Sequence, residues 1–337
     1  MQRIFRTRSA RIGATVAAMV ILVAIILYLG NSKHFGPVQY AQLIVDGIRG
    51  GSIYALIALG FVVVFNVTGI INFAQGGFVM SGAMIAVAFN NLELPLHPGL
   101  KLALAVVLGV VITTIIGALV ERLSIFPARH SHVLTLIIIT VGVYIFMQGV
   151  ALLSWGADPY YLPAFTTLAL EDHIIRIGGI MIKAQSLWIW ATVAVVLVAL
   201  AFFFGRTLLG KALRACAINR RAAELMGINP SRMSLLAFAL AAALGAIGGI
   251  VLAPATRPMY DMGLRLGLKG FIAAIMGGLV SSPGAVVGGV LLGVLENLGA
   301  GVTKAGFKDI FAFIILILIL LFRPQGIIGG GERGVEE

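Results

Sequence analysis

The chain has 337 residues, of which 60% are hydrophobic and 11% are charged, and its mean hydropathy is +1.06. Because soluble domains carry about 25% charged residues, and because the apolar runs do not alternate with polar residues, this composition excludes both a soluble globular protein and a membrane β-barrel. The net charge is +11, and the positive residues lie in the segments between apolar runs. There they are typical of residues that set membrane orientation and contact anionic lipid, rather than of nucleic-acid binding.

The N-terminal segment combines a basic start with a long apolar run over about residues 12–29. Its arginines are Arg3, Arg6, Arg8 and Arg11. The run is longer than the apolar core of a secretory signal, and no small-residue cleavage site precedes Asn31. We therefore expect residues 1–37 to form a basic, cytoplasmic N-terminus and an additional, uncleaved first transmembrane helix; a cleaved signal is the alternative.

The next apolar stretches predict membrane spans over about residues 38–66, 69–89, 101–120 and 133–154. The stretch 69–89 is the least regular of them, because it contains Asn72, Gln75, Gly76, Gly77 and Ser81. Buried polar groups in lipid need partners, so these residues should face protein or a water-filled path. Hydrogen bonding between helices is the alternative for Asn72 and Gln75. The pair Gly76–Gly77 predicts a helix break that exposes backbone groups.

Two polar segments flank the span at 133–154. The segment 121–132 is basic, so it is expected in the cytoplasm, and its His130 and His132 are interpreted as loop residues because no carboxylate or thiol cluster accompanies them. The segment 155–186 is then external. Its tryptophan and tyrosines are typical of a membrane interface, and it could receive a soluble partner or be a plain interfacial loop.

After a span at 187–204, residues 206–232 form a basic segment between two apolar flanks. Its charged residues are Arg206, Lys211, Arg214, Arg220, Arg221 and Arg232, with Glu224 as the one acid. This charge favours the cytoplasmic side. The sequence predicts helices over Leu208–Asn219 and Arg220–Met226, followed by Gly227 just beyond the helix end and Pro230 at the start of the next element. Such a folded segment favours a docking surface for a soluble partner, and an ordinary positive loop is the alternative.

The remaining spans are short or rich in small residues. Residues 233–252 predict a tightly packed helix, and the four charges within 253–269 predict an outer loop. The run 271–280 is too short to span, and Gly- and Pro-interrupted segments of this kind point to a translocation site. The break consists of Ser281, Ser282, Pro283 and Gly284, and small-xxx-small spacing continues through Gly284, Gly288 and Gly289. With a last span at 311–322, we expect an all-α polytopic membrane protein with about ten transmembrane helices and both termini cytoplasmic.

The sequence offers no catalytic chemistry. It contains no P-loop, H-E-x-x-H or G-x-S-x-G motif, and no histidine lies in a span to activate Ser281 or Ser282. Cys216 is the only cysteine, which leaves no internal disulfide and no thiolate metal cluster. A membrane-embedded enzyme, a metal and a cofactor are therefore not expected. An ion-coupled carrier would need carboxylates deep in the membrane. The candidates are Asp46, Glu121, Glu296 and Asp309. Three of them lie near predicted span ends, and Glu296 is the candidate for a deeper position.

Three segments together resemble one transporter family. They are residues 51–83, residues 214–229, and residues 267–294 with RPQG at 323–326 behind them. In this order they resemble the LivH type, the permease subunit of branched-chain amino acid ABC importers. The resemblance covers residues 38–328 as one permease domain and leaves 329–337 as a cytoplasmic tail.

The resemblance implies a non-catalytic inner-membrane subunit for branched-chain or related amino acids, with urea or another small polar solute as the alternative cargo. Its implied partners are a LivM-like second permease, two cytoplasmic ATP-binding subunits and an extracytoplasmic solute-binding protein. The segment 206–232 would couple to an ATPase through Arg214, Ala215, Asn219, Ala223, Glu224, Gly227 and Ile228. Asn219 replaces a common Asp of the family, and Gly77 replaces a frequent acid. The translocation-path candidates are Asn72, Gln75, Gly76, Gly77, Ser81, Ser281, Ser282 and Gly284.

Overall fold

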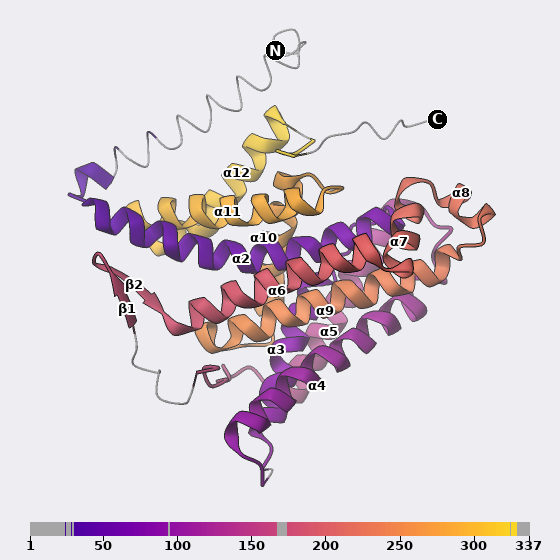
Figure 1. Cartoon of the computed structure of the whole chain (residues 1–337), viewed down its shortest axis with the longest axis horizontal. Helices are drawn as coiled ribbons and strands as arrows, with labels where there is room; N and C mark the ends of the chain where they lie inside the picture. Colours follow the sequence, from indigo (N-terminus) through magenta and orange to yellow (C-terminus); the bar gives the residue numbers. More distant parts are fainter. Residues whose placement is uncertain are drawn as a thin grey trace. The chain divides into compact units, whose positions relative to one another are not determined.

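The structure is a computed structural model, and it describes residues 24, 28, 30–93, 95–166, 174–323 and 325–328. The first predicted helix lies almost entirely outside these residues, as do the tail at 329–337 and residues 167–173 of the predicted outer segment. The described chain is predominantly helical (Figure 1), which confirms the predicted all-α polytopic class.

Eleven α-helices and one hairpin make up most of the described chain. The helices are α2 (Pro37–Thr68), α3 (Gln75–Asn91), α4 (Pro98–Val120), α5 (Val133–Trp155), α6 (Ala184–Arg206), α7 (Leu208–Ile218), α8 (Arg220–Leu225), α9 (Pro230–Thr256), α10 (Met262–Gly277), α11 (Ser282–Val302) and α12 (Lys308–Phe322). A π-helical turn, η1 (Glu121–Ile125), extends α4, and a 3-10 turn, η2 (Ala305–Phe307), precedes α12. The hairpin pairs β1 (Ile174–Ile177) with β2 (Ile180–Lys183).

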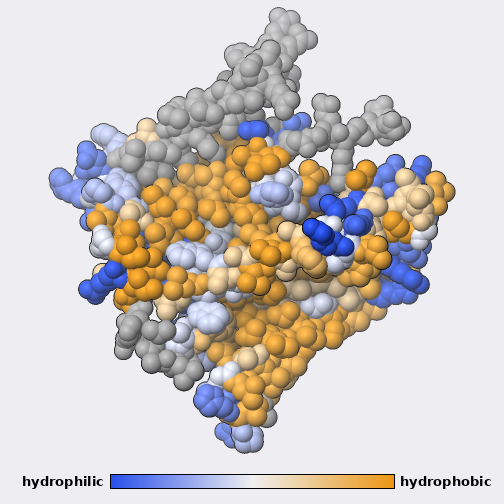
Figure 2. Space-filling model, in the orientation of Figure 1, coloured by the Kyte–Doolittle hydropathy of each residue, from blue (hydrophilic) through white to orange (hydrophobic). Residues whose placement is uncertain are grey.

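Six of the described helices are long and apolar enough to cross a membrane. They cover Pro37–Thr68, Pro98–Ile125, Val133–Trp155, Ala184–Arg206, Pro230–Thr256 and Ser282–Val302. The helices α3, α10 and α12 are shorter, with 17, 16 and 15 residues. Hydrophobic residues cover most of the visible described surface (Figure 2), as expected for a chain bathed in lipid. The number of about ten crossings and the cytoplasmic termini stay predictions.

The predicted break at Gly76–Gly77 is wrong in position. Both glycines lie in the first turn of α3, and the non-helical stretch is residues 69–74, which begins at Gly69 with φ +74°. The glycines serve a different purpose, because a Cβ added at Gly76 would overlap the carbonyl oxygen of Gly263 in α10. Close approach of two helices, rather than a kink, therefore explains Gly76.

The predicted outer loop over 253–269 is also wrong in extent. Helix α9 continues to Thr256 and α10 begins at Met262, so the loop between them is residues 257–261. The two later charges of this stretch, Arg265 and Lys269, belong to α10. They are four residues apart and share one helix face, so a helix can carry both while its glycines face the protein.

The chain forms two compact units, and the larger one is built on α3, α4 and α9. This unit comprises residues 56–174 and 183–271. Its three central helices all contact one another, and α4 and α9 can be followed in Figure 1. An added Cβ at Gly249 of α9 would overlap the carbonyl oxygen of Val79, and one at Gly82 of α3 would overlap Ala246. Glycine is therefore a packing requirement in this interface.

The smaller unit comprises residues 1–55, 175–182 and 272–337. Within it, the first part of α2 lies against α11 through two glycine pairs with i, i+4 spacing. A Cβ at Gly51 would lie 2.6 Å from the carbonyl oxygen of Gly289, and Gly47 and Gly293 meet in the same way. The predicted small-xxx-small packing is confirmed, but Gly284 and Gly288 instead approach Gly277 of α10.

We predict that Gly249→Ala destabilises the purified protein by about 1–3 kcal/mol, because the new methyl group has no room beside α3. Thermal unfolding in detergent measures the change. Gly142→Ala on α5 is the matched control, because its added Cβ meets nothing within 4 Å. Equal melting temperatures for the two variants would contradict the close packing of α3 on α9.

Candidate functional site

The basic segment 206–232 is folded, and its first helix begins at a side-chain cap. The Oγ1 of Thr207 accepts a hydrogen bond from the Gly210 amide at 3.0 Å and donates to the Phe203 carbonyl at 2.6 Å. This cap ends α6 and starts α7, so the two helices are joined without a flexible linker. The observed helix, Leu208–Ile218, confirms the prediction to within one residue.

The second helix of the segment is capped at both ends. Asn219 Oδ1 accepts from the Ala222 amide at 2.9 Å and so caps the start of α8. At the other end, the Ile228 amide donates to the Ala223 carbonyl and the Gly227 amide to the Glu224 carbonyl, both at 3.0 Å. With Gly227 at φ +82°, these two bonds form a Schellman motif. The predicted roles of Gly227 and of the helix over Arg220–Met226 are confirmed.

The cap also bears on the substitution of Asn219 for aspartate. Asparagine and aspartate are about equally good at a helix start, because both offer a side-chain oxygen to the backbone amides. The geometry of α8 therefore does not depend on a negative charge at this position. Asn229 caps α9 in the same manner, with amides of Ser231 and Arg232 at 3.0 and 3.2 Å and Pro230 in the first turn.

One side of this segment is packed and the other is open. Leu213, Cys216 and Ala223 are buried. Leu225 and Met226, at the tip, are 89% and 83% exposed. Two adjacent large apolar side chains on a rigid, charged turn are unfavourable in water, and methionine is enriched at protein interfaces. The predicted coupling residues Arg214 and Glu224 are exposed, and Ala215 and Ile228 are half-buried.

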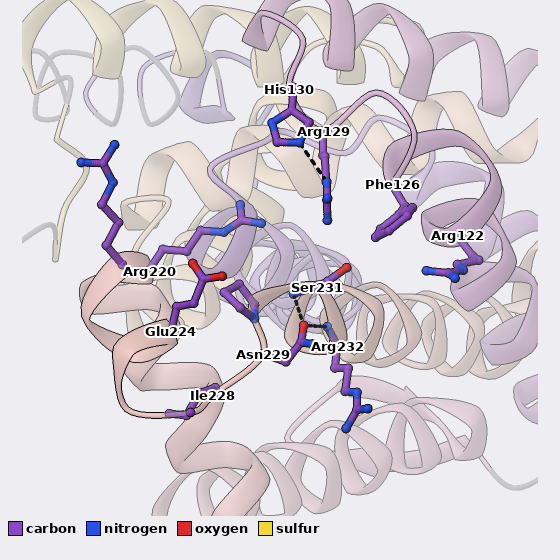
Figure 3. Close-up of a pocket in the computed structure, with 13 residues that line it drawn as sticks. Arg122, Phe126, Arg129, His130, Arg220, Glu224, Ile228, Asn229, Ser231 and Arg232 are labelled. Atoms are coloured by element: carbon purple, nitrogen blue, oxygen red, sulfur yellow. Dashed lines mark hydrogen bonds between the residues drawn. The ribbon is translucent and has the colours of Figure 1, made fainter.

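A cationic cleft adjoins the segment, and the sequence did not predict it. It measures about 850 Å³ (Figure 3). Its charged lining comprises Arg122, Arg129, Arg220, Arg221, Arg232 and Glu224. The first two come from residues 121–132, which the sequence placed on the same side of the membrane as the basic segment. The missing information was contact between those two segments, which charge alone does not specify.

The path candidates of the larger unit are buried inside it. Asn72 and Gln75 are fully buried, and Gly76 and Gly77 are buried. Asn72 Oδ1 accepts from the Ala74 amide at 3.1 Å, and Gln75 Nε2 donates to the Ala241 carbonyl at 2.9 Å. Ser81 is buried in the same helix. Gln75 thus joins α3 to α9 by the interhelical hydrogen bond of the alternative. The Asn72 side chain instead bonds within its own turn, and its buried Nδ2 has no hydrogen-bond partner among the described residues.

The path candidates of the smaller unit form a helix start. Ser281 Oγ accepts from the Gly284 amide at 3.1 Å and so caps α11, and Gly278 turns the chain with φ +96°. Ser281 and Ser282 are half-buried, and Gly284 is buried. A break between α10 and α11 is present, but it covers residues 278–281 rather than 281–284, because Ser282, Pro283 and Gly284 lie in the first turn of α11.

The membrane carboxylates lie in distinct settings. Asp46 pairs with Arg49 at 3.2 Å and accepts a hydrogen bond from Gln42 at 3.0 Å. Glu296 is fully buried in α11, 3.9 Å from Lys308 Nζ. Glu121 is buried in η1, where Ser234 donates a hydrogen bond and three arginines lie near. Among the described residues no cluster of His, Cys, Asp and Glu could hold a metal ion.

These features define a multi-pass helical membrane protein whose basic segment rigidly joins two spans. Residues 43–320 match the family described as "Branched-chain amino acid transport system / permease component". The chain belongs to this family, as its resemblance to the LivH type indicated. No solved structure matches.

The curated relatives cover nearly the whole chain. It is 36% identical to the high-affinity branched-chain amino acid transport system permease protein BraD of Pseudomonas aeruginosa, over 87% of this chain and 97% of the relative. It is 33% identical to the permease LivH of Escherichia coli, over 87% of this chain and 96% of the relative. The ribose import permease RbsC of Haemophilus influenzae is more distant, with 22% identity over 90% of this chain and 89% of the relative. These relatives are transport proteins rather than enzymes.

We predict that Cys216 reacts slowly with maleimide in the folded protein. Burial raises the pKa of its thiol, an effect that nearby Arg220 only partly offsets, so the reactive thiolate is scarce below the raised pKa and increases as pH rises through it. Labelling rates between pH 7 and 9, compared with the same protein in denaturing detergent, measure this. A rate equal to that of a free thiol in the native protein would mean that α7 does not pack as described.

Proposed function

We propose that the chain is the transmembrane permease subunit of an ATP-driven importer for branched-chain or related amino acids. The observation that carries the proposal is its identity of 33–36% to permeases named for those amino acids, over almost their whole length. The sugar permeases among the relatives share 22–24%, so a sugar is the weaker candidate.

The proposed assembly follows from this family. The chain would lie in the inner membrane with about ten crossings and both ends inside, and it would pair with a LivM-like permease to form the translocation path. Two cytoplasmic ATP-binding subunits would drive transport, and an extracytoplasmic binding protein would deliver the solute. The basic charge of 206–232 supports its cytoplasmic position.

The coupling residues would act in two ways. Asn219, Ala223 and Gly227 would hold the shape of α8, because they supply its cap, its buried contact and its Schellman turn. The exposed Arg214 and Glu224 would contact the ATPase, and Leu225 and Met226 would enter an apolar groove on it. A rigid tip can transmit a push, which a flexible loop would absorb.

The path candidates divide in the same manner. Asn72, Gln75, Gly76 and Gly77 would shape the path indirectly, because the packed interior of this chain encloses them. Ser281 and Ser282 are accessible and polar at a helix start, so they would offer hydroxyl groups to a zwitterion. Ser81 would support the first set of residues from within α3, and Gly284 would support the two serines from within α11.

We expect Leu225→Gln with Met226→Gln to weaken co-purification of the ATP-binding subunits by about tenfold or more, since buried apolar anchors dominate interface energies. Both side chains are exposed, so the permease itself should fold normally. The matched control is Ile177→Gln, which removes another exposed apolar side chain, from β1. Unchanged association of the double variant would remove the tip from the interface.

Transport by the reconstituted assembly tests the function itself. With its binding protein and ATP-binding subunits in liposomes, the chain should concentrate leucine, isoleucine or valine only when ATP is present on the ATPase side. Urea and ribose serve as competing solutes. Accumulation driven by an ion gradient without ATP would overturn the proposal, and uptake of urea in place of the amino acids would correct the substrate.

A further inference from the structure

The cationic cleft is formed by three stretches of the larger unit. These are η1 with the turn that follows it, α8 with its Schellman turn, and the start of α9. In the stick view Arg129 and Phe126 lie on one side of the cleft and Ser231 on the other, whereas the side chain of Arg232 points away from them (Figure 3). Five arginines against Glu224 leave the lining with a surplus of four positive charges when His130 is neutral.

Two of these arginines are held in place by an aromatic ring. Arg122 lies 4.4 Å and Arg129 4.6 Å from the centroid of Phe126, which lies between them in Figure 3. Arg129 Nε also donates to His130 Nε2 at 3.2 Å. Cation–π contacts of this kind fix the direction of a guanidinium plane while leaving its N–H groups available to an anion.

Internal acids do not balance this charge. In the described part of the chain, no salt bridge within 4.0 Å joins any of the five arginines to a carboxylate. Glu121 lies in a smaller adjoining cavity of about 50 Å³ and accepts a hydrogen bond from Ser234. Including it still leaves a surplus of three charges. All five arginines are exposed, so water and salt screen part of their repulsion, and a bound external anion would lower it further.

The donors for that anion are the guanidinium groups. The backbone amides of Ser231 and Arg232 at the start of α9 already donate to the Asn229 side chain. The helix start therefore offers an anion little beyond its dipole. A guanidinium offers paired N–H groups whose spacing matches two oxygens of a phosphate, and this match favours phosphate over a spherical anion such as chloride. A cavity of about 850 Å³ also has room for the rest of a headgroup.

Exposed apolar residues beside the cleft identify the carrier of the phosphate. The cleft lies where the apolar spans Pro98–Ile125 and Pro230–Thr256 have their ends. Leu123 follows Arg122 directly and is exposed, as are Val133 and Leu134 beyond the turn. Arginines next to lipid-accessible leucines can hold a headgroup while the acyl chains lie against the span.

We propose that this cleft is a binding site for the phosphate of an anionic phospholipid headgroup. The site goes beyond the proposed transport function. Arg122 and Arg129 of its lining lie outside the coupling segment 206–232, whereas Arg220, Arg221, Glu224 and Arg232 belong to it. Leu225 and Met226 do not line it, so the tip of α8 stays available to a protein partner.

Native mass spectrometry of the purified full chain, without ATPase subunits, tests the proposal. Phosphatidylglycerol is the probe, phosphatidylcholine the neutral lipid, and pyrophosphate the soluble competitor. We expect retention of phosphatidylglycerol to fall about tenfold in Arg122→Gln with Arg129→Gln, because each basic residue at a membrane surface contributes appreciably to anionic-lipid binding. Arg122→Lys with Arg129→Lys should retain an intermediate amount, since the charge stays but the paired donors are lost.

The matched control is Arg206→Gln with Lys211→Gln, which removes the same charge from residues that do not line the cleft. It should retain phosphatidylglycerol like the parent protein, and slow maleimide labelling of Cys216 verifies folding in every variant. Equal losses in both double variants would reduce the effect to general charge and overturn the site. Binding of pyrophosphate without phosphatidylglycerol would overturn the lipid assignment, and unchanged retention of phosphatidylglycerol in Arg122→Gln with Arg129→Gln would overturn the site.

Discussion

Close approach of helix backbones is the constraint on which the larger unit depends. Lipid gives helices no hydrophobic reason to associate, so contact must come from van der Waals packing and hydrogen bonds at short range. The interface of α3 with α9 satisfies this with Gly82, Gly245 and Gly249, and Gln75 adds a bond to a backbone carbonyl. Some polar and small residues that suggest a functional site in the sequence therefore serve to pack the helices against one another.

Part of this organisation was readable from the sequence because it is local. Caps and turns depend on a few neighbouring residues, so Gly227, Pro230 and the two short helices were predicted almost to the residue. The small-residue spacing of α11 was equally plain. Its partners were not, since the same spacing serves α2 through Gly289 and Gly293 and α10 through Gly284 and Gly288.

The errors arose where charge or glycine was interpreted without its neighbours. Gly76 resembled a helix break, yet its lack of a side chain accommodates the backbone of α10. Arg265 suggested a loop, yet a helix can expose one charged face beside lipid headgroups or a protein partner. The cationic cleft was missed for the complementary reason: residues 121–132 and 206–232 were each recognised as basic, but only the fold brings them to one surface.

The rigid turn joins the exposed tip at Leu225 and Met226 to the ends of the spans. Ala223 is buried and α8 is capped at both ends, so a displacement of Leu225 carries Arg220 with it. Arg220 lies within the electrostatic reach of Glu121, whose carboxylate is bonded to Ser234 of α9. A movement imposed at the tip would therefore change the charge around a buried carboxylate between α4 and α9. A lipid phosphate beside Arg122 would act on the same carboxylate, so membrane composition and partner docking would bias one common element.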